Sequence, residues 1–207
     1  MNLSRRNLRF PLPALALMAP LVLAVPAPPW DALRWVAPHG TTLSWAPAAR
    51  AVELRGSTYF TRPPWKVTLL SYRTTVGERR ASYYFTIELS PEAGAPLARL
   101  SIRQTRGADW DFPFKVEQTR AFLGAPRRER RAVPVEAVFN PEQRRFTIEF
   151  PQPVAPGETV TVVLRPWHNP MQADTYLFAV TAWPVGPDPV ASPVGFGTLR
   201  IYNRFTW

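Results

Sequence analysis

The chain has 207 residues, 46% of them hydrophobic, which suffices for one domain with a proper core and argues against a disordered chain. It carries a net charge of +10 and no cysteine, so disulfide frameworks, thiolate nucleophiles and zinc–thiolate sites are excluded. The 25 prolines favour a structure rich in turns and edge strands, because proline fits poorly inside helices and central strands.

The first residues have the pattern of a secretory signal peptide. Arg5, Arg6 and Arg9 form a basic region, and an apolar stretch interrupted by proline follows over residues 14–25. Residues 4–8 also resemble a twin-arginine export signal, and an uncleaved anchor is the alternative to cleavage. Loss of the three arginines would lower the net charge from +10 to +7.

We predict three segments. Residues 1–24 form the signal peptide, with cleavage after Ala24 or after Ala27, where small residues offer a site. Residues 25–50 form an irregular lead-in rich in proline and tryptophan, and residues 51–207 form a single β-sandwich domain. We expect an exported chain, in the periplasm, cell envelope or extracellular space. It would have no transmembrane segment after signal removal, because spanning needs about 20 continuous apolar residues.

Short runs of alternating apolar and polar residues recur along the domain. In residues 83–89, the odd-numbered side chains are apolar or aromatic and would share one face of a strand. The predicted strands are residues 52–60, 66–72, 83–89, 97–105, 133–139, 145–150, 159–164, 175–183 and 198–202. This spacing predicts an all-β fold, an immunoglobulin-like or Greek-key β-sandwich of about eight to nine strands.

One segment departs from the strand pattern. Residues 116–123 predict a short helix, with Gly124 in the left-handed position after it and Pro126 preventing continuation. Near the end of the chain, residues 173–178 resemble the tyrosine corner of Greek-key sandwiches. In this motif, the hydroxyl of Tyr176 would form a hydrogen bond with the backbone, and the side chain of Phe178 would lie in the core.

Several runs also resemble a known family. They are TVGERRASYYFTIEL, QTRGADWDF, TRAFLG, TVTVVLRPWHNP, ADTYLFAV and VGFGTLRIYNR. They are similar to a family of exported cyanobacterial proteins classed as a domain of unknown function, number 2808 in that series, over about residues 65–204. The resemblance implies a cyanobacterial envelope or periplasmic setting. It brings no reaction and no catalytic residues.

Asp109, Trp110 and Asp111 form a loop in which two carboxylates flank an indole. A sugar can stack on tryptophan while carboxylates accept its hydroxyl hydrogens, and carboxylates can also bind calcium. In the alternative interpretation, Trp110 plugs one end of the sandwich and the aspartates are caps or partners of Arg103 and Arg106. Two carboxylates this close in sequence rarely supply both catalytic groups of a glycosidase.

His39 and His168 are the two histidines, and Met171 lies near the second. Copper sites need a cluster of such ligands, and the sequence offers no further one nearby. Neither a Gly-x-Ser-x-Gly elbow nor a phosphate-binding glycine motif occurs. We therefore predict no catalytic residue, no metal site and no cofactor.

The densest basic run contains Arg127, Arg128, Arg130 and Arg131. Arginine grips carboxylate, sulfate or phosphate through paired hydrogen bonds, so the run predicts contact with an anionic glycan or a lipid head group. A solvated basic loop is the alternative. Nucleic acid would be an unusual partner for an exported chain.

Together these features predict an exported, non-enzymatic β-sandwich that acts as a binding or structural module of the cell envelope. Its partner would be an anionic glycan, a lipid head group or an envelope protein. Two alternatives stay open. One is a carbohydrate-active envelope enzyme using Asp109 and Asp111, and the other is a subunit of a surface assembly that pairs through edge strands.

Overall fold

The computed structural model describes residues 52–203, so the predicted signal peptide and lead-in lie outside the described part. Twelve strands and one 3₁₀ turn lie within it. Their bounds are β1 Val52–Leu54, β2 Ser57–Tyr59, β3 Val67–Leu70, β4 Tyr83–Glu88, β5 Leu97–Arg106, η1 Val116–Gln118, β6 Arg120–Leu123, β7 Ala132–Val133, β8 Glu136–Asn140, β9 Arg145–Val154, β10 Thr159–Leu164, β11 Thr175–Pro184 and β12 Ser192–Arg200. No helix in this range is long and apolar enough to cross a membrane.

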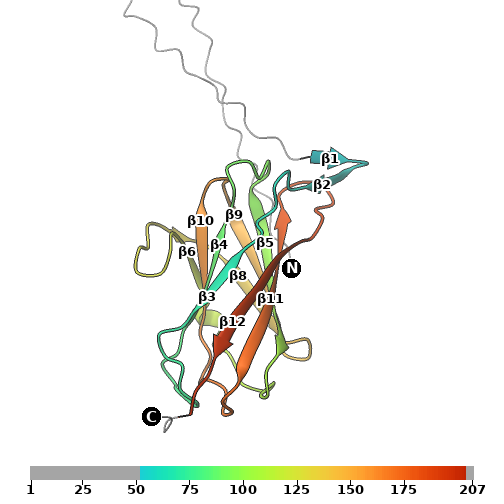
Figure 1. Cartoon of the computed structure of the whole chain (residues 1–207). Coiled ribbons are helices and arrows are strands. Elements are labelled where there is room, and N and C mark those ends of the chain that lie inside the picture. Colours follow the sequence, from blue (N-terminus) through green and yellow to red (C-terminus); the bar gives the residue numbers. More distant parts are fainter. Residues whose placement is uncertain (1–51, 204–207) are drawn as a thin grey trace, which may run out of the picture. The chain divides into compact units, whose positions relative to one another are not determined.

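Ten of the strands form two five-stranded antiparallel sheets that pack face to face (Figure 1). The β4 sheet has the strand order β3-β4-β10-β6-β7, and the β5 sheet has the order β12-β11-β5-β9-β8. β1 and β2 form a separate two-stranded hairpin. The predicted all-β sandwich is therefore confirmed, with twelve strands in the described residues instead of the expected eight to nine.

The core lies between the two sheets and is built by alternation along the strands. The four predicted inward side chains of residues 83–89 are each at most 2% exposed. In β11, every second side chain over residues 176–184 is buried. The ring of Phe178 meets those of Phe85 and Tyr83, with centroids 5.6 and 6.3 Å apart. Each large buried side chain contributes about 1.5–3 kcal/mol, so these contacts hold the sheets together.

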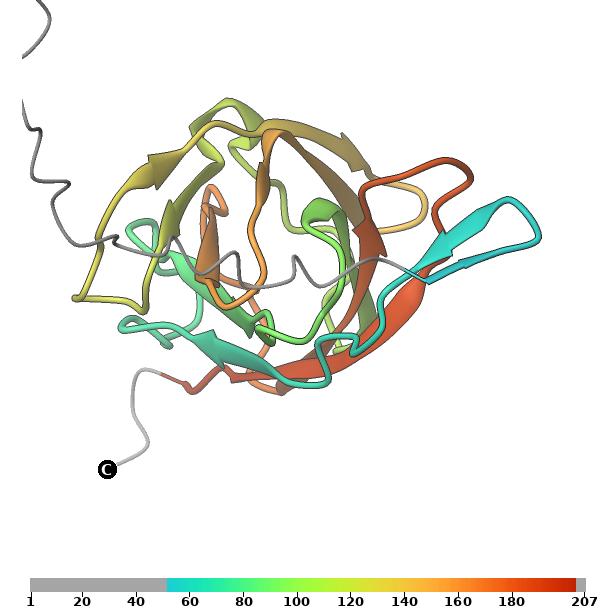
Figure 2. The same ribbon diagram turned by 90° about the horizontal axis from the view of Figure 1, so that it is seen from above.

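One side of the sandwich is closed where β12 lies against β3 (Figure 2). Gly197 permits this approach, because a Cβ atom there would lie 2.9 Å from the Cβ atom of Leu69. Beyond β12, the N–H of Tyr202 donates to the carbonyl of Thr74 at 2.8 Å. The N–H of Val76 in turn donates to the carbonyl of Tyr202 at 2.9 Å, so the chain end is joined to the β3–β4 loop.

Two predicted strands are each divided in the structure. Residues 52–60 form the β1–β2 hairpin, whose turn residues Arg55 and Gly56 have φ of 54° and 86°. Positive φ at both central positions is what a tight two-residue hairpin turn requires. Residues 133–139 span both sheets, because β7 belongs to the β4 sheet and β8 to the β5 sheet. Pro134 lies between them and has no N–H with which to continue a ladder.

The predicted helix over residues 116–123 is wrong beyond its first turn. Val116–Gln118 forms a 3₁₀ turn, and β6 follows as a strand paired with β10 and β7. Gly124 does have a positive φ of 102°, but it ends a strand and not a helix. A Cβ atom there would lie 2.3 Å from the carbonyl oxygen of Arg128. Pairing with central β10, which buries Phe122, outweighs the weak helix preference of this segment.

Candidate functional site

Two arginines lie directly opposite each other on the outer face of the β5 sheet. Arg103 of β5 and Arg145 of β9 are Cα partners in the strand register. Side chains in such positions have Cβ atoms only about 5 Å apart, so two positive charges there repel each other. Within residues 52–203, neither arginine forms a salt bridge. The pair is therefore an uncompensated positive site.

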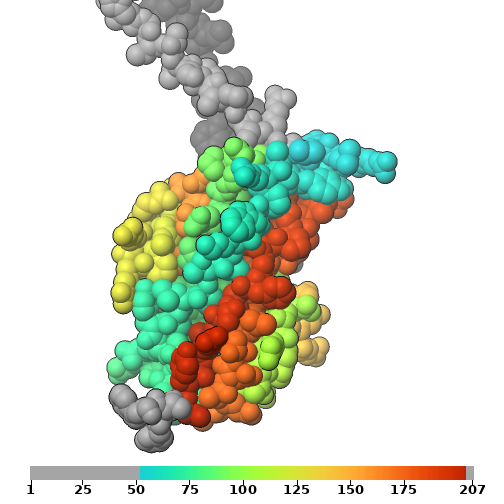
Figure 3. Space-filling view, in the orientation of Figure 1, coloured from blue at the N-terminus to red at the C-terminus, as the bar shows by residue number. Residues whose placement is uncertain are grey.

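Both arginines border two open pockets on this face, which together we call the groove. One part, of about 510 Å³, is also bordered by Gln104, Thr105, Trp110, Glu142 and Gln143. The other part, of about 270 Å³, is also bordered by Ser101, Ala179, Thr181 and Trp183. In the first part, Trp110 comes from the segment that follows β5, and Glu142 and Gln143 come from the β8–β9 turn. These two segments lie side by side at the right of Figure 3. Arg103 and Arg145 thus lie between two tryptophans.

Arg99, which lies beside Trp183 on the same face, has partners for its charge. The guanidinium of Arg99 lies 5.7 Å from the centre of the Trp183 ring. Its Nε also donates to Oε1 of Glu149 at 2.7 Å. Arg99 therefore has both an anion and an aromatic ring, whereas the neighbouring Arg103–Arg145 pair has no salt-bridge partner in the described part of the chain.

The loop that carries Trp110 is held in place by Asp109. Oδ1 of Asp109 accepts the N–H of Asp111 at 3.1 Å, and Oδ2 accepts the N–H of Met171 at 2.9 Å. These bonds engage both oxygens of the Asp109 carboxylate, one within the loop and one with the segment between β10 and β11. Trp110 is 47% exposed and Asp111 is exposed, so the indole faces solvent instead of plugging the sandwich. The end of the core is filled by fully buried Phe112.

The start of the same loop packs on Tyr176. A Cβ atom at Gly107 would lie 2.1 Å from Cδ1 of Tyr176, so glycine is required at this contact. The Tyr176 hydroxyl donates to the carbonyl of Gln172 at 2.8 Å, which is the geometry of a tyrosine corner. Burial, the main cause, raises the pKa of Tyr176 to about 12. The anchoring role of Tyr176 stays a prediction that a hydroxyl deletion can test.

A buried arginine beneath the groove was not predicted from the sequence. Arg144 is 8% exposed, and its guanidinium lies 4.8 to 5.6 Å from the ring centres of Phe112, Phe114 and Phe139. It donates to Oε1 of Gln104 at 3.3 Å and to the carbonyl of Phe112 at 3.0 Å. Burial lowers the pKa of Arg144, and nearby aspartate charges oppose that shift. Arg144 thus holds the Trp110 loop onto the core.

The predicted basic run lies in the β6–β7 loop, which we call the arginine loop (residues 124–131). It protrudes in yellow in Figure 3. Arg130 forms an ion pair with Glu158, and the guanidinium of Arg127 lies 4.2 Å from the centre of the Tyr72 ring. Arg128 is exposed and has no salt bridge in the described part of the chain. The four charges therefore occur in different surroundings.

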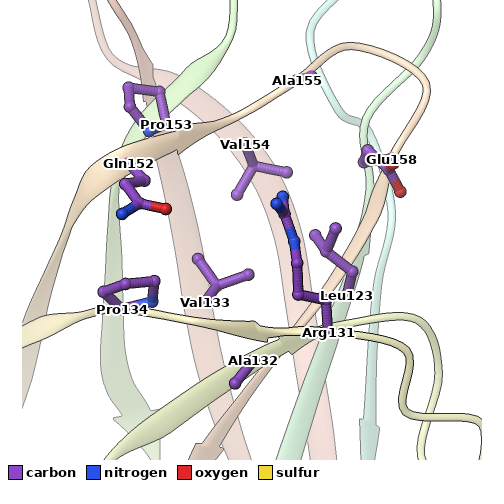
Figure 4. Close-up of a pocket in the computed structure, with 10 residues that line it drawn as sticks. All are labelled: Leu123, Arg131, Ala132, Val133, Pro134, Gln152, Pro153, Val154, Ala155 and Glu158. Atoms are coloured by element: carbon purple, nitrogen blue, oxygen red, sulfur yellow. The ribbon is translucent and has the colours of Figure 1, made fainter.

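Arg131 points into a small cleft at the other side of the sandwich (Figure 4). The cleft lies between β6, β7 and the end of β9, and Figure 4 shows the Arg131 side chain directed toward Val154 with Leu123 beside it. Its volume is about 80 Å³, well below the roughly 300 Å³ at which ligand pockets begin. This cleft is too small for a polymer.

His168 has a local partner. Its Nδ1 lies 2.8 Å from the carbonyl oxygen of Asn169, while His39 lies outside the described residues. Asn169 itself is fully buried and accepts the hydroxyl of Tyr83 at 2.8 Å. No group of three or more His, Cys, Asp or Glu side chains that could hold a metal ion occurs in residues 52–203.

A family model described as "Protein of unknown function (DUF2808)" matches residues 57–201, which cover both sheets and the groove. The chain belongs to the DUF2808 family. The family description names no reaction and no ligand, so function has to be argued from the residues of this chain. No curated protein matches the chain in sequence.

Several solved structures are similar in fold. The collagen-binding subdomain of the Enterococcus faecalis surface protein ACE is 9% identical, with 67% of this chain and 97% of that one covered and a TM-score of 0.41. The collagen-binding domain of a Staphylococcus aureus adhesin is 8% identical, with 67% and 95% covered and a TM-score of 0.37. MyfA, the major subunit of Myf fimbriae from Yersinia enterocolitica, is 8% identical, with 66% and 96% covered and a TM-score of 0.35. Similarity at this level does not indicate a shared ligand.

Proposed function

We propose that this DUF2808 member is an exported, non-enzymatic binding module of the cell envelope that holds an anionic polymer on the outer face of the β5 sheet. The observation that carries the proposal is the cross-strand pair Arg103 and Arg145, which lines the groove and forms no salt bridge among the described residues. A bound anion would relieve the repulsion between the two guanidinium groups and accept their hydrogen bonds.

Export and setting are part of the proposal. The basic and apolar pattern at the start of the chain supports a signal peptide over residues 1–24, cleaved after Ala24 or Ala27. A cyanobacterial envelope is the setting that the sequence resemblance implies. Mass spectrometry of the exported protein tests the processing, and a mature chain that still begins at Met1 would refute cleavage.

The arginine loop serves as a second, weaker contact. Arg127, Arg128, Arg130 and Arg131 add positive charge on another face, where an anionic glycan or lipid head group can be attracted over a distance of about 8 Å at physiological salt. The rival enzymatic role of Asp109 and Asp111 has less support, because the Asp109 carboxylate already accepts two backbone N–H groups.

The test is the retention of the protein on immobilised polygalacturonate, an acidic polysaccharide, as the salt concentration rises. We expect Arg103→Ser/Arg145→Ser to weaken binding at least roughly tenfold at low salt, because a hydrogen bond to a charged group is worth about 1.5–3 kcal/mol. The matched control is Arg79→Ser/Arg80→Ser, which removes the same charge from exposed positions of the β3–β4 loop. Equal losses in both variants would show a non-specific charge effect and overturn the proposal.

A further inference from the structure

We propose that the ligand of the groove is an acidic oligosaccharide segment that spans from Trp110 to Trp183, with a sugar ring stacked at each end and acidic groups held by Arg103 and Arg145 between them. This inference rests on the proposed function and adds the chemical class and the length of the ligand. The two tryptophans border the two parts of the groove, and both arginines border each part.

The length follows from the strand register. Trp183 lies opposite Arg99, and Arg103 lies four residues further along β5. Four residues of an extended strand cover roughly 13 Å. After β5 the chain folds back, with Nε2 of Gln104 donating to the carbonyl of Asp109 at 2.9 Å, so Trp110 borders the same part of the groove as Arg103. A ligand that reaches both tryptophans therefore extends over roughly this distance, which a single sugar unit cannot do.

The lining indicates a sugar. An indole offers a large, flat, apolar surface with a negative face, on which the C–H groups of a sugar ring can pack. Ser101 and Thr181 bring hydroxyl groups to the groove that can donate to or accept from sugar hydroxyls. The Thr105 hydroxyl donates to the carbonyl of Leu177 at 3.3 Å and can still accept. This combination of flat apolar ends and a hydroxyl-bearing middle matches the alternating surfaces of a polysaccharide.

The charge pattern favours a ligand that presents neutral hydroxyls as well as acidic groups. Glu142 borders the same part of the groove as Trp110 and would repel a negative group placed beside it. Neutral hydroxyls fit near Glu142, while carboxylates or sulfates fit near Arg103 and Arg145. Single-stranded nucleic acid also combines stacking with negative charge, so a single-stranded oligonucleotide belongs in the test.

The experiment compares oligogalacturonates of increasing length with polyglutamate, a polyanion without sugar rings, by isothermal titration calorimetry. We expect Trp110→Ala and Trp183→Ala each to lower the affinity for long oligogalacturonates roughly tenfold and to leave polyglutamate binding within about twofold. Trp110→Phe and Trp183→Phe keep a flat aromatic surface and should retain most of the affinity. Arg103→Ser/Arg145→Ser should weaken the binding of both polymers.

The outcomes separate this inference from the proposed function. Alanine variants that bind oligogalacturonate as well as the parent overturn sugar stacking, while the loss in the double arginine variant still supports an anion site. A monomer that binds as tightly as the long chains overturns the two-ended site, and tighter, tryptophan-dependent binding of a single-stranded oligonucleotide overturns the glycan. If the parent binds neither polymer, the proposed function itself fails. Unchanged circular dichroism of each variant ensures that a loss of binding is not a loss of fold.

Discussion

The arginine loop and the outer face of the β5 sheet carry the same kind of side chain in opposite circumstances. The loop concentrates its arginines in sequence, yet Arg130 is paired with Glu158 and Arg127 lies over Tyr72. The sheet brings together Arg103 and Arg145, which are far apart in sequence, and gives them no anion among the described residues. Charge density along the chain is therefore a poor guide to charge that is available for a ligand.

The difference has a simple physical origin. A loop at the surface can turn its long side chains toward nearby carboxylates and rings, so its charges find partners at little cost. Strand register fixes the spacing of cross-strand neighbours, and Arg103 and Arg145 can move apart only by bending their side chains away from each other. A repulsive arrangement that the fold keeps in place is more informative about binding than a run of loop charges that have other partners.

The largest expected effect is on stability, and it compares Arg144, which has hydrogen-bond and ring partners, with Arg145, which has no salt bridge among the described residues. Arg144→Ala should lower the free energy of unfolding by about 3 kcal/mol, because it leaves Gln104 and the carbonyl of Phe112 without a donor and removes three ring contacts. Urea denaturation measures this change. The control is Arg145→Ala at the next residue, which should change stability by less than about 0.5 kcal/mol. Similar losses in both variants would contradict the distinction.

The second prediction tests directly whether the arginine loop or the Arg103–Arg145 pair contributes more to binding. Replacing Arg127, Arg128, Arg130 and Arg131 by serine removes twice as much charge as Arg103→Ser/Arg145→Ser. We nevertheless expect a smaller effect, a loss of polygalacturonate affinity of about threefold, because exposed loop charges act mainly by long-range attraction that salt screens. Retention at several salt concentrations measures both variants. If the loop variant loses more affinity than the sheet variant, the binding face is the arginine loop.

Alternation in the sequence was sufficient to predict most of the sandwich. Residues 159–164 were predicted as a strand and form β10 with those bounds, and the inward face of residues 83–89 is buried as expected. β6 was missed because its four residues are too short for a periodic signal. The first half of β12 was missed because Gly195 and Gly197 are poor strand residues. Close packing against β3, which needs glycine, determines this part of β12.

The candidate site could be predicted only in part. Alternation placed Arg103 on the outer face of its strand, and the sequence marked Trp110 as a binding residue. The register between β5 and β9 could not be obtained in this way, because a slip of two residues keeps every side chain on the same face. The Arg103–Arg145 pair and its approach to Trp183 are therefore tertiary features. The partners of the loop arginines were invisible in the sequence for the same reason.

The third prediction concerns the anchor of the loop that carries Trp110. Tyr176→Phe removes the hydroxyl that donates to Gln172 and should lower the free energy of unfolding by about 1 kcal/mol. Polygalacturonate binding should not change, because the ring that supports Gly107 is kept. Denaturant unfolding and calorimetry measure the two quantities. A variant as stable as the parent would count against the tyrosine corner.

The same hydroxyl gives a dependence on pH. The pKa of Tyr176 is raised from 10.0 to about 12, chiefly by burial, so the folded protein holds this proton more tightly than the unfolded chain. The contribution of Tyr176 to stability is complete below pH 10 and is lost as the pH rises toward 12. In Tyr176→Phe, the fall in stability over this range should be shallower. Part of the fall in stability should remain in this variant, because burial also raises the pKa of Tyr83. Equal slopes in parent and variant would contradict the shift.

The smallest effect has the opposite sign and follows from the repulsion itself. Arg103→Thr removes one charge of the cross-strand pair and introduces a residue that favours strands, so it should raise the free energy of unfolding by about 0.5 kcal/mol. The matched control is Arg106→Thr on the same strand, whose neighbour is Leu177 and whose removal relieves no repulsion. The gain should shrink at high salt, because screening weakens the repulsion in the parent. Arg103→Thr should also weaken polygalacturonate binding, because it removes one guanidinium group of the proposed site. A gain in stability with a loss of binding is expected where a protein keeps an unfavourable arrangement for its ligand. A gain of the same size in Arg106→Thr would mean that strand preference, and not the charge pair, is the cause.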